Sequence, residues 1–100
     1  MKNRNELEIA ASANNAFVAI ESAKEETSNE SDEDILSRLE NLVRGIIKGE
    51  YKLVEDLRKI IESEEMNSIF SFEVTAGGLS LPLERFLRDL IDAVKTKVSA

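Results

Sequence analysis

The chain has 100 residues, of which 42% are hydrophobic and 33% charged, and its formal net charge at pH 7 is −7. This length fits one domain with its own core, and no apolar run approaches the roughly 20 residues of a membrane span. The chain has no cysteine, which excludes disulfides and thiolate chemistry, and no histidine, which removes the commonest general base.

The first predicted element is a helix over residues 4–25. Six of the fourteen residues from Ala10 to Ala23 are alanine, which gives high helix propensity but little side-chain area to bury. Such a helix needs a closely approaching partner. It packs within its own fold or, alternatively, forms a dimer or helix-exchange surface, for which Phe17 and Ile20 are candidate interface residues.

The next segment is strongly acidic. Residues 21–34 carry seven acidic residues against Lys24, and no residue from Glu25 to Asp34 is apolar. We interpret residues 25–33 as a flexible acidic linker, because like-charge runs of this kind are usually solvated. Ser31, with an acid three positions later, resembles the capping box of a following helix.

The central segment, residues 33–65, has apolar residues at helical spacing whose phase does not change. One continuous helix of this length would measure about 50 Å, whereas a compact domain of this size is only about 35 Å across. We favour one long helix, bent at the candidate kink Gly49 and Glu50 and covered partly by a second subunit. The alternative is a break at residues 47–51 and two helices.

This stripe supplies most of the predicted interface. Its members are aliphatic residues that a neighbouring subunit would cover: Leu39, Leu42, Val43, Ile46, Leu53, Leu57 and Ile60. The outer face carries opposite charges at four-residue spacing, which we interpret as solvated helix support: Asp34–Arg38, Glu40–Arg44, Glu55–Lys59 and Arg58–Glu62.

The final third begins with a change of period from 3.6 to 2. Apolar and polar residues alternate on both sides of Gly77-Gly78, which predicts a two-stranded hairpin at about 69–82 with Val74 opposite Leu81. The alternative is an extended segment that places its phenylalanines in the core. Pro82 then suits the first turn of a last helix, residues 82–98. The predicted fold class is mainly α, a bundle of three or four helices with a small hairpin.

Two carboxylate pairs lie one helical turn apart, Glu62 with Glu65 and Asp89 with Asp92. In this spacing alone they resemble the all-helical nucleotide pyrophosphohydrolases of the MazG type, and the resemblance implies bound magnesium. The apolar stripes, however, place these carboxylates on outward faces, where a solvated surface is the expected structure.

We therefore expect a non-enzymatic protein–protein interaction or assembly module that acts as a helical homodimer in the cytoplasm. We expect no catalytic, cofactor-binding or metal-binding residue and no cofactor. The chain has no basic stripe, so we expect no nucleic-acid partner, and no membrane partner either. One alternative is an acidic antitoxin or immunity-type inhibitor of a basic partner. Another is the magnesium-dependent nucleotide hydrolase.

Overall fold

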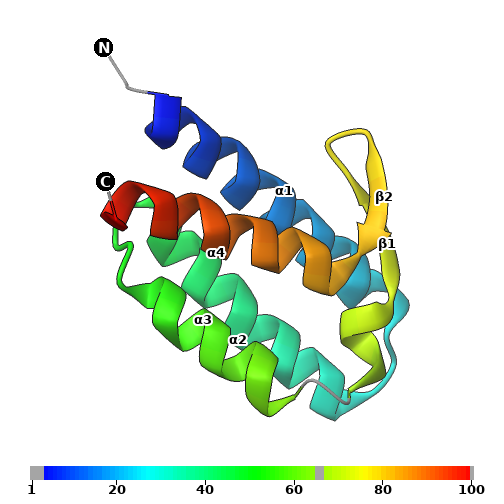
Figure 1. Ribbon diagram of the computed structural model, residues 1–100. Helices are drawn as coiled ribbons and strands as arrows, with labels where there is room; N and C mark the ends of the chain where they lie inside the picture. The colour runs from blue at the N-terminus through cyan, green and yellow to red at the C-terminus, as the bar shows by residue number, and fades with distance from the viewer. Residues whose placement is uncertain (1–3, 65–66, 100) are drawn as a thin grey trace.

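The computed structural model describes residues 4–64 and 67–99, and it confirms the predicted fold class. Four helices, a short 3-10 helix and two strands follow one another along the chain (Figure 1): α1 (Arg4–Glu26), α2 (Glu30–Ile47), α3 (Leu53–Ser63), η1 (Ser68–Ser71), β1 (Glu73–Ala76), β2 (Leu79–Pro82) and α4 (Leu83–Ser99). The last helix ends within one residue of its predicted position.

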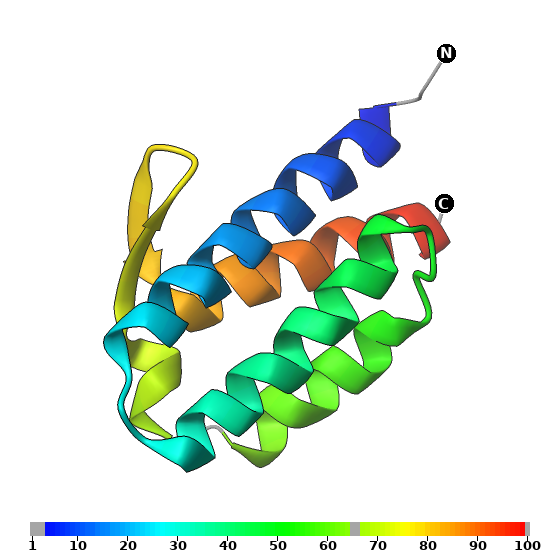
Figure 2. The same cartoon turned by 180° about the vertical axis from the view of Figure 1, so that it is seen from behind.

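The four helices form a closed arrangement in which each packs on its two neighbours. α1 lies against α2 and α4, and α3 lies against the same two helices. The hairpin and η1 stand at one end of the bundle, while the turn between α2 and α3 lies at the other end, beside the start of α1 (Figures 1 and 2). The bundle measures 42 × 27 × 19 Å.

One hydrophobic core joins all four helices to η1 and the hairpin. Its large side chains that are fully shielded from solvent are aliphatic: Ile20, Leu36, Leu39, Val43, Ile46, Leu57, Ile61, Leu83, Leu87, Leu90 and Val94. Phe70 and Val74 extend this core under the hairpin. Each helix thus buries one stripe, as its amphipathic pattern predicts.

The preferred prediction of one long helix over residues 33–65 is wrong, because the chain turns back between α2 and α3. Gly49 has a φ of +102°, a backbone conformation that favours glycine. Its N–H donates to the Ile46 carbonyl and the Glu50 N–H donates to the Gly45 carbonyl, each at 3.0 Å. These two bonds are the Schellman arrangement that ends a helix at a glycine.

The unchanged phase of the stripe has a simple explanation in the folded chain. The stripes of α2 and α3 both face the common core, so the pattern reports which side is buried and not whether the axis continues. Because the chain turns back, the two helices fit within a bundle whose longest dimension is 42 Å, whereas one continuous helix over residues 33–65 would measure about 50 Å.

The predicted acidic linker at 25–33 is also mostly wrong. α1 continues to Glu26 and α2 begins at Glu30, so only residues 27–29 connect them. The N-cap of α2 is Asn29, not Ser31, and the Asn29 side-chain oxygen accepts hydrogen bonds from the backbone N–H groups of Ser31 and Asp32. Acidic residues in the first turn of α2 then lie where the helix dipole stabilises negative charge.

The hairpin has the predicted register, with Val74 paired to Leu81 in antiparallel strands. It is shorter than predicted, because the segment before β1 forms η1. The N-cap residue Asn67 accepts the Ile69 N–H through its side chain, which favours this turn. Of the two phenylalanines in this segment, Phe70 is buried in the core and Phe72 is exposed.

Three of the four predicted surface ion pairs form: Asp34–Arg38, Glu40–Arg44 and Arg58–Glu62. The fourth is different, because Glu55 contacts Arg58 and not Lys59. Arg58 Nη2 donates to Glu55 Oε2 at 2.6 Å, and this hydrogen bond, together with the arginine charge, lowers the pKa of the Glu55 carboxyl. Most of these ion pairs lie within one helix and are exposed to solvent, as predicted for pairs that stabilise a helix surface.

Candidate functional site

The outer side of α1 exposes a long stretch of helix without charged residues. None of the twelve residues from Ile9 to Ile20 is charged, although a third of the whole chain is. The inner side of this stretch is buried, and Leu7, Ala11, Asn14 and Val18 remain exposed on the other side. We call these four residues the α1 outer face.

The α1 outer face has a regular spacing. Its residues follow one another at steps of four, three and four, which places them in one line along a helix. The two large members are at the ends of the line, with Leu7 56% exposed and Val18 47% exposed. The two small ones, Ala11 and Asn14, lie between them.

Alanines on the inner side explain why α1 presents this face and no other. Ala13, Ala16 and Ala19 are fully buried, so α1 approaches its neighbours closely. On a third side it contacts β1, and the Gly77 backbone lies so near the Asn15 side chain that a Cβ there would collide with it. α2, α4 and the hairpin cover the inner sides of α1, while Glu8, Ala10 and Glu21 are exposed beside its outer face.

A buried carboxylate also joins α1 to α2. Glu40 is only 7% exposed, so the prediction that it is a solvated surface residue is wrong. Its carboxylate lies 3.5 Å from Lys24 Nζ of α1 and 3.6 Å from Arg44 Nη2. The Arg44 guanidinium stands 5.4 Å from the centre of the Phe17 ring, within the range of a cation–π contact. These contacts set the rotation of α1 on the bundle.

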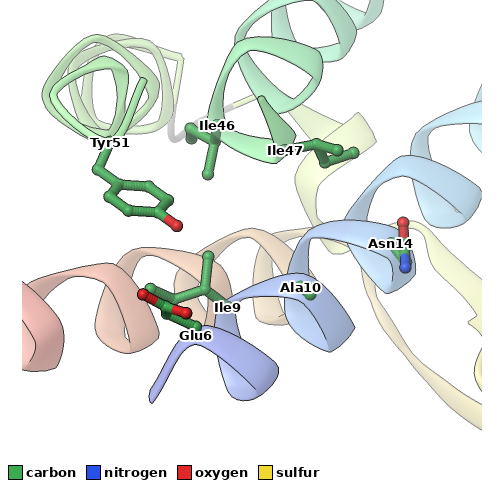
Figure 3. A pocket seen from close by; sticks show the side chains of 7 residues that line it. All are labelled: Glu6, Ile9, Ala10, Asn14, Ile46, Ile47 and Tyr51. Atoms are coloured by element: carbon green, nitrogen blue, oxygen red, sulfur yellow. The ribbon is translucent and has the colours of Figure 1, made fainter. Parts of the chain in front are cut away.

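A pocket of about 220 Å³ lies beside the α1 outer face, where α1 meets the C-terminal end of α2 (Figure 3). Four of the seven residues that line it are apolar, namely Ile9, Ala10, Ile46 and Ile47, and the other three are Glu6, Asn14 and Tyr51. Ile47 is 48% exposed, and it extends the apolar surface from α1 onto α2.

A shallower groove of about 420 Å³ lies on the other side of α1, toward α4. Asp89 and Asp92 line it together with Glu8, so the predicted aspartate pair lies beside a third carboxylate. Within residues 4–64 and 67–99, no group of three acidic residues is arranged to hold a metal ion. Glu62 is exposed and accepts a hydrogen bond from Arg58, and Glu65 lies outside the described residues.

The structure places most of the predicted interface residues inside the single chain. Five are fully buried in the core, so they are not a surface that a partner can reach: Ile20, Leu39, Val43, Ile46 and Leu57. Four are half-buried and packed against the core: Phe17, Leu42, Leu53 and Ile60. The candidate kink, Gly49 and Glu50, lies in the turn between α2 and α3.

The α1 outer face was missed because two of its four residues, Ala11 and Asn14, are not strongly apolar. The signal that could have found it is the uncharged stretch between Glu8 and Glu21, combined with the regular spacing of Leu7 and Val18. An exposed helix face in so charged a chain would normally carry charges.

No helix in the part of the chain that the structure describes is long and apolar enough to cross a membrane. Comparison with family models, with curated proteins and with solved structures finds no match to this chain.

Proposed function

We propose that this protein is a non-enzymatic interaction module that self-associates as a homodimer through the α1 outer face. The observation that carries the proposal is the exposure of Leu7 and Val18 on the outer side of α1, which has no charged residue from Ile9 to Ile20. Exposed apolar surface of this kind is typical of protein–protein contacts.

Charge favours contact between copies at this face over other faces. Each copy has a net charge of −7, so two copies repel one another in most orientations. The uncharged stretch from Ile9 to Ile20 allows close approach with fewer like charges in contact, although Glu8, Asp89 and Asp92 line the groove on one side of it.

The size of the face indicates a reversible dimer. Leu7 and Val18 already bury about half of their surface, so a dimer gains roughly 1 kcal/mol from each, or about 4 kcal/mol from both copies. Association costs at least about 4 kcal/mol in lost freedom of motion. Contacts from Ala11, Asn14 and Ile47 must supply the remaining free energy, and we expect dilution to dissociate the dimer.

The acidic residues at the start of α2 support an inhibitor of a basic protein less directly. Glu30, Asp32 and Glu33 occupy the first turn of α2, where the helix dipole accounts for their charge without a partner. We therefore base the proposed function on the α1 outer face.

The substitution Asn14→Glu tests this proposal. It places a carboxylate in the middle of the α1 outer face, and in the dimer that charge would lose its water without gaining a partner. We expect sedimentation equilibrium to show self-association of the unmodified protein and its loss in Asn14→Glu. Because Asn14 is exposed, thermal unfolding at low protein concentration should change little.

Asn41→Glu is the matched control. Asn41 is exposed on α2, so the substitution and the added charge are the same while the α1 outer face is intact. It should leave self-association nearly unchanged. Equal weakening by the two variants would show that net charge, and not this face, governs association and would refute the proposal.

A further inference from the structure

We infer that the pocket between α1 and the C-terminal end of α2 binds a small organic ammonium ion, which is a protonated amine with one ring or a short alkyl chain. This role is separate from self-association and does not depend on it. A concave site with apolar walls and a few polar groups is the usual form of a small-molecule site. The size of the pocket, its lining and the charge of the chain together select the class of ligand.

The apolar side of the pocket fits the body of such a ligand. Ile9, Ala10, Ile46 and Ile47 supply it, and the side chains of Ile9 and Ile46 also belong to the core. An apolar cavity of about 150 Å³ in a protein interior holds a benzene ring. The volume here is about 220 Å³, so the pocket has room for one ring and a short side chain.

The polar side of the pocket selects a cation. Glu6 supplies a carboxylate, Asn14 an amide and Tyr51 a phenol. In Figure 3 the Tyr51 hydroxyl points toward the side of the pocket that Glu6 lines. An ammonium group gains a charge-assisted hydrogen bond from a carboxylate, and a tyrosine ring attracts a cation that lies over its face. None of the seven described residues that line the pocket is basic, so a carboxylate or phosphate ligand would be repelled.

The wider distribution of charge favours the same class of ligand. The chain has a net charge of −7, which raises the concentration of cations near its surface. Glu6 lies in the first turn of α1, whose N-terminal end carries about half a positive charge, whereas α2 ends at Ile47 with about half a negative charge. Because these two helix ends offset one another, the Glu6 carboxylate sets the sign of charge that the pocket prefers.

The fold holds the lining in place without a ligand. Tyr51 lies in the turn after α2, where its N–H donates to the Gly49 carbonyl at 3.0 Å and its carbonyl accepts the Val54 N–H at 3.1 Å. The Tyr51 side chain packs against the core, and Ile9 and Ile46 are almost fully buried. Walls that do not have to be ordered on binding lower the cost of binding.

A titration with phenethylamine, followed by the backbone amide signals in NMR spectra, tests the inference. At neutral pH this probe joins one ring to one ammonium group. At low protein concentration we expect saturable shifts at Glu6, Ala10 and Tyr51, with a dissociation constant of about 1 mM. Phenethyl alcohol has nearly the same shape without the charge, so it should bind roughly five- to tenfold more weakly.

The acidic groove on the other side of α1 is an internal control for attraction by charge alone. Glu8, Asp89 and Asp92 line it, so nonspecific cation binding would shift signals there at least as much as in the pocket. Glu6→Gln should raise the dissociation constant of the amine roughly five- to tenfold and leave that of the alcohol nearly unchanged. Glu8→Gln removes the same charge from the same helix and should change neither constant.

Ala10→Met blocks the pocket without changing its charge. Ala10 is exposed and lines the pocket, so the longer side chain can occupy the site without entering the core. Both the amine and the alcohol should then lose their binding. None of these variants alters Leu7 or Val18, so a failure here is distinct from a failure of self-association through the α1 outer face.

Four results would overturn the inference. The first is the absence of shifts in the pocket up to about 10 mM amine. The second is binding of the alcohol as tight as that of the amine. The third is equal weakening by Glu6→Gln and Glu8→Gln, which would show that net charge alone attracts the amine. The fourth is unchanged binding in Ala10→Met.

Discussion

Replacing Leu57 with alanine is expected to lower the free energy of unfolding by about 2–5 kcal/mol, the usual range for a buried leucine. Leu57 lies on α3 and is fully shielded from solvent by the core of the single chain. The removed side-chain atoms lose their apolar contacts, and a packed core collapses only partly around the cavity that remains. Urea denaturation followed by circular dichroism measures the change.

The same measurement separates a core residue from an interface residue. A core role makes the loss independent of protein concentration, whereas an interface role makes it grow as the dimer forms. Leu42→Ala is the control, because Leu42 is half-buried on α2 and should cost about 1 kcal/mol or less. Equal and concentration-dependent losses in both variants would support the interface that the sequence predicted.

Replacing Ala13 with glutamate should destabilise the fold by about 3–5 kcal/mol or prevent folding. Ala13 is fully buried on the inner side of α1, so the new carboxylate would lie among apolar groups without a cation and would push α1 away from its neighbours. Thermal unfolding at low concentration and the soluble yield report this effect.

The neighbouring substitution Asn14→Glu is its matched comparison. The two sites are adjacent in the sequence and about 100° apart around α1, with Ala13 buried and Asn14 exposed. We expect a stable, monomeric protein from Asn14→Glu and an unstable one from Ala13→Glu. Similar stability of the two would mean that α1 is rotated on the bundle differently from the structure.

The sequence was sufficient to predict the elements whose ends or pairs depend on local signals. The clean apolar stripe identifies the buried side of α4, which begins directly after Pro82, although Pro82 ends β2 and does not lie in the first turn of α4 as predicted. The Gly77-Gly78 pair sets the hairpin register of Val74 with Leu81. In both cases one local feature has one low-energy outcome.

The long central segment could not be predicted in this way. Its apolar phase is the same for one helix and for two antiparallel helices on a common core. Gly49 tolerates a helix interior at a cost of about 1 kcal/mol, so its presence alone does not end a helix. The two backbone bonds that close the turn, to the Ile46 and Gly45 carbonyls, form only in the folded chain.

The candidate site was mispredicted for a related reason. An amphipathic stripe shows that a face is covered but not whether the cover comes from the same chain, and α1, α3 and α4 supply it for Leu39 and its neighbours. The α1 outer face, by contrast, is exposed, and no clear apolar stripe marks it in the sequence. Alanines on both sides of α1 blur its pattern, so only burial in the structure distinguishes Ala13 from Ala11.

The most direct measurement of the central claim is a dilution series followed by the backbone amide signals of the unmodified protein in NMR spectra. Self-association through α1 predicts that dilution shifts the signals of Leu7, Ala11 and Val18, while those of Leu42 and Ile60 on the α2–α3 side stay fixed. Shifts confined to Leu42 and Ile60, or no shift at any concentration, would contradict it.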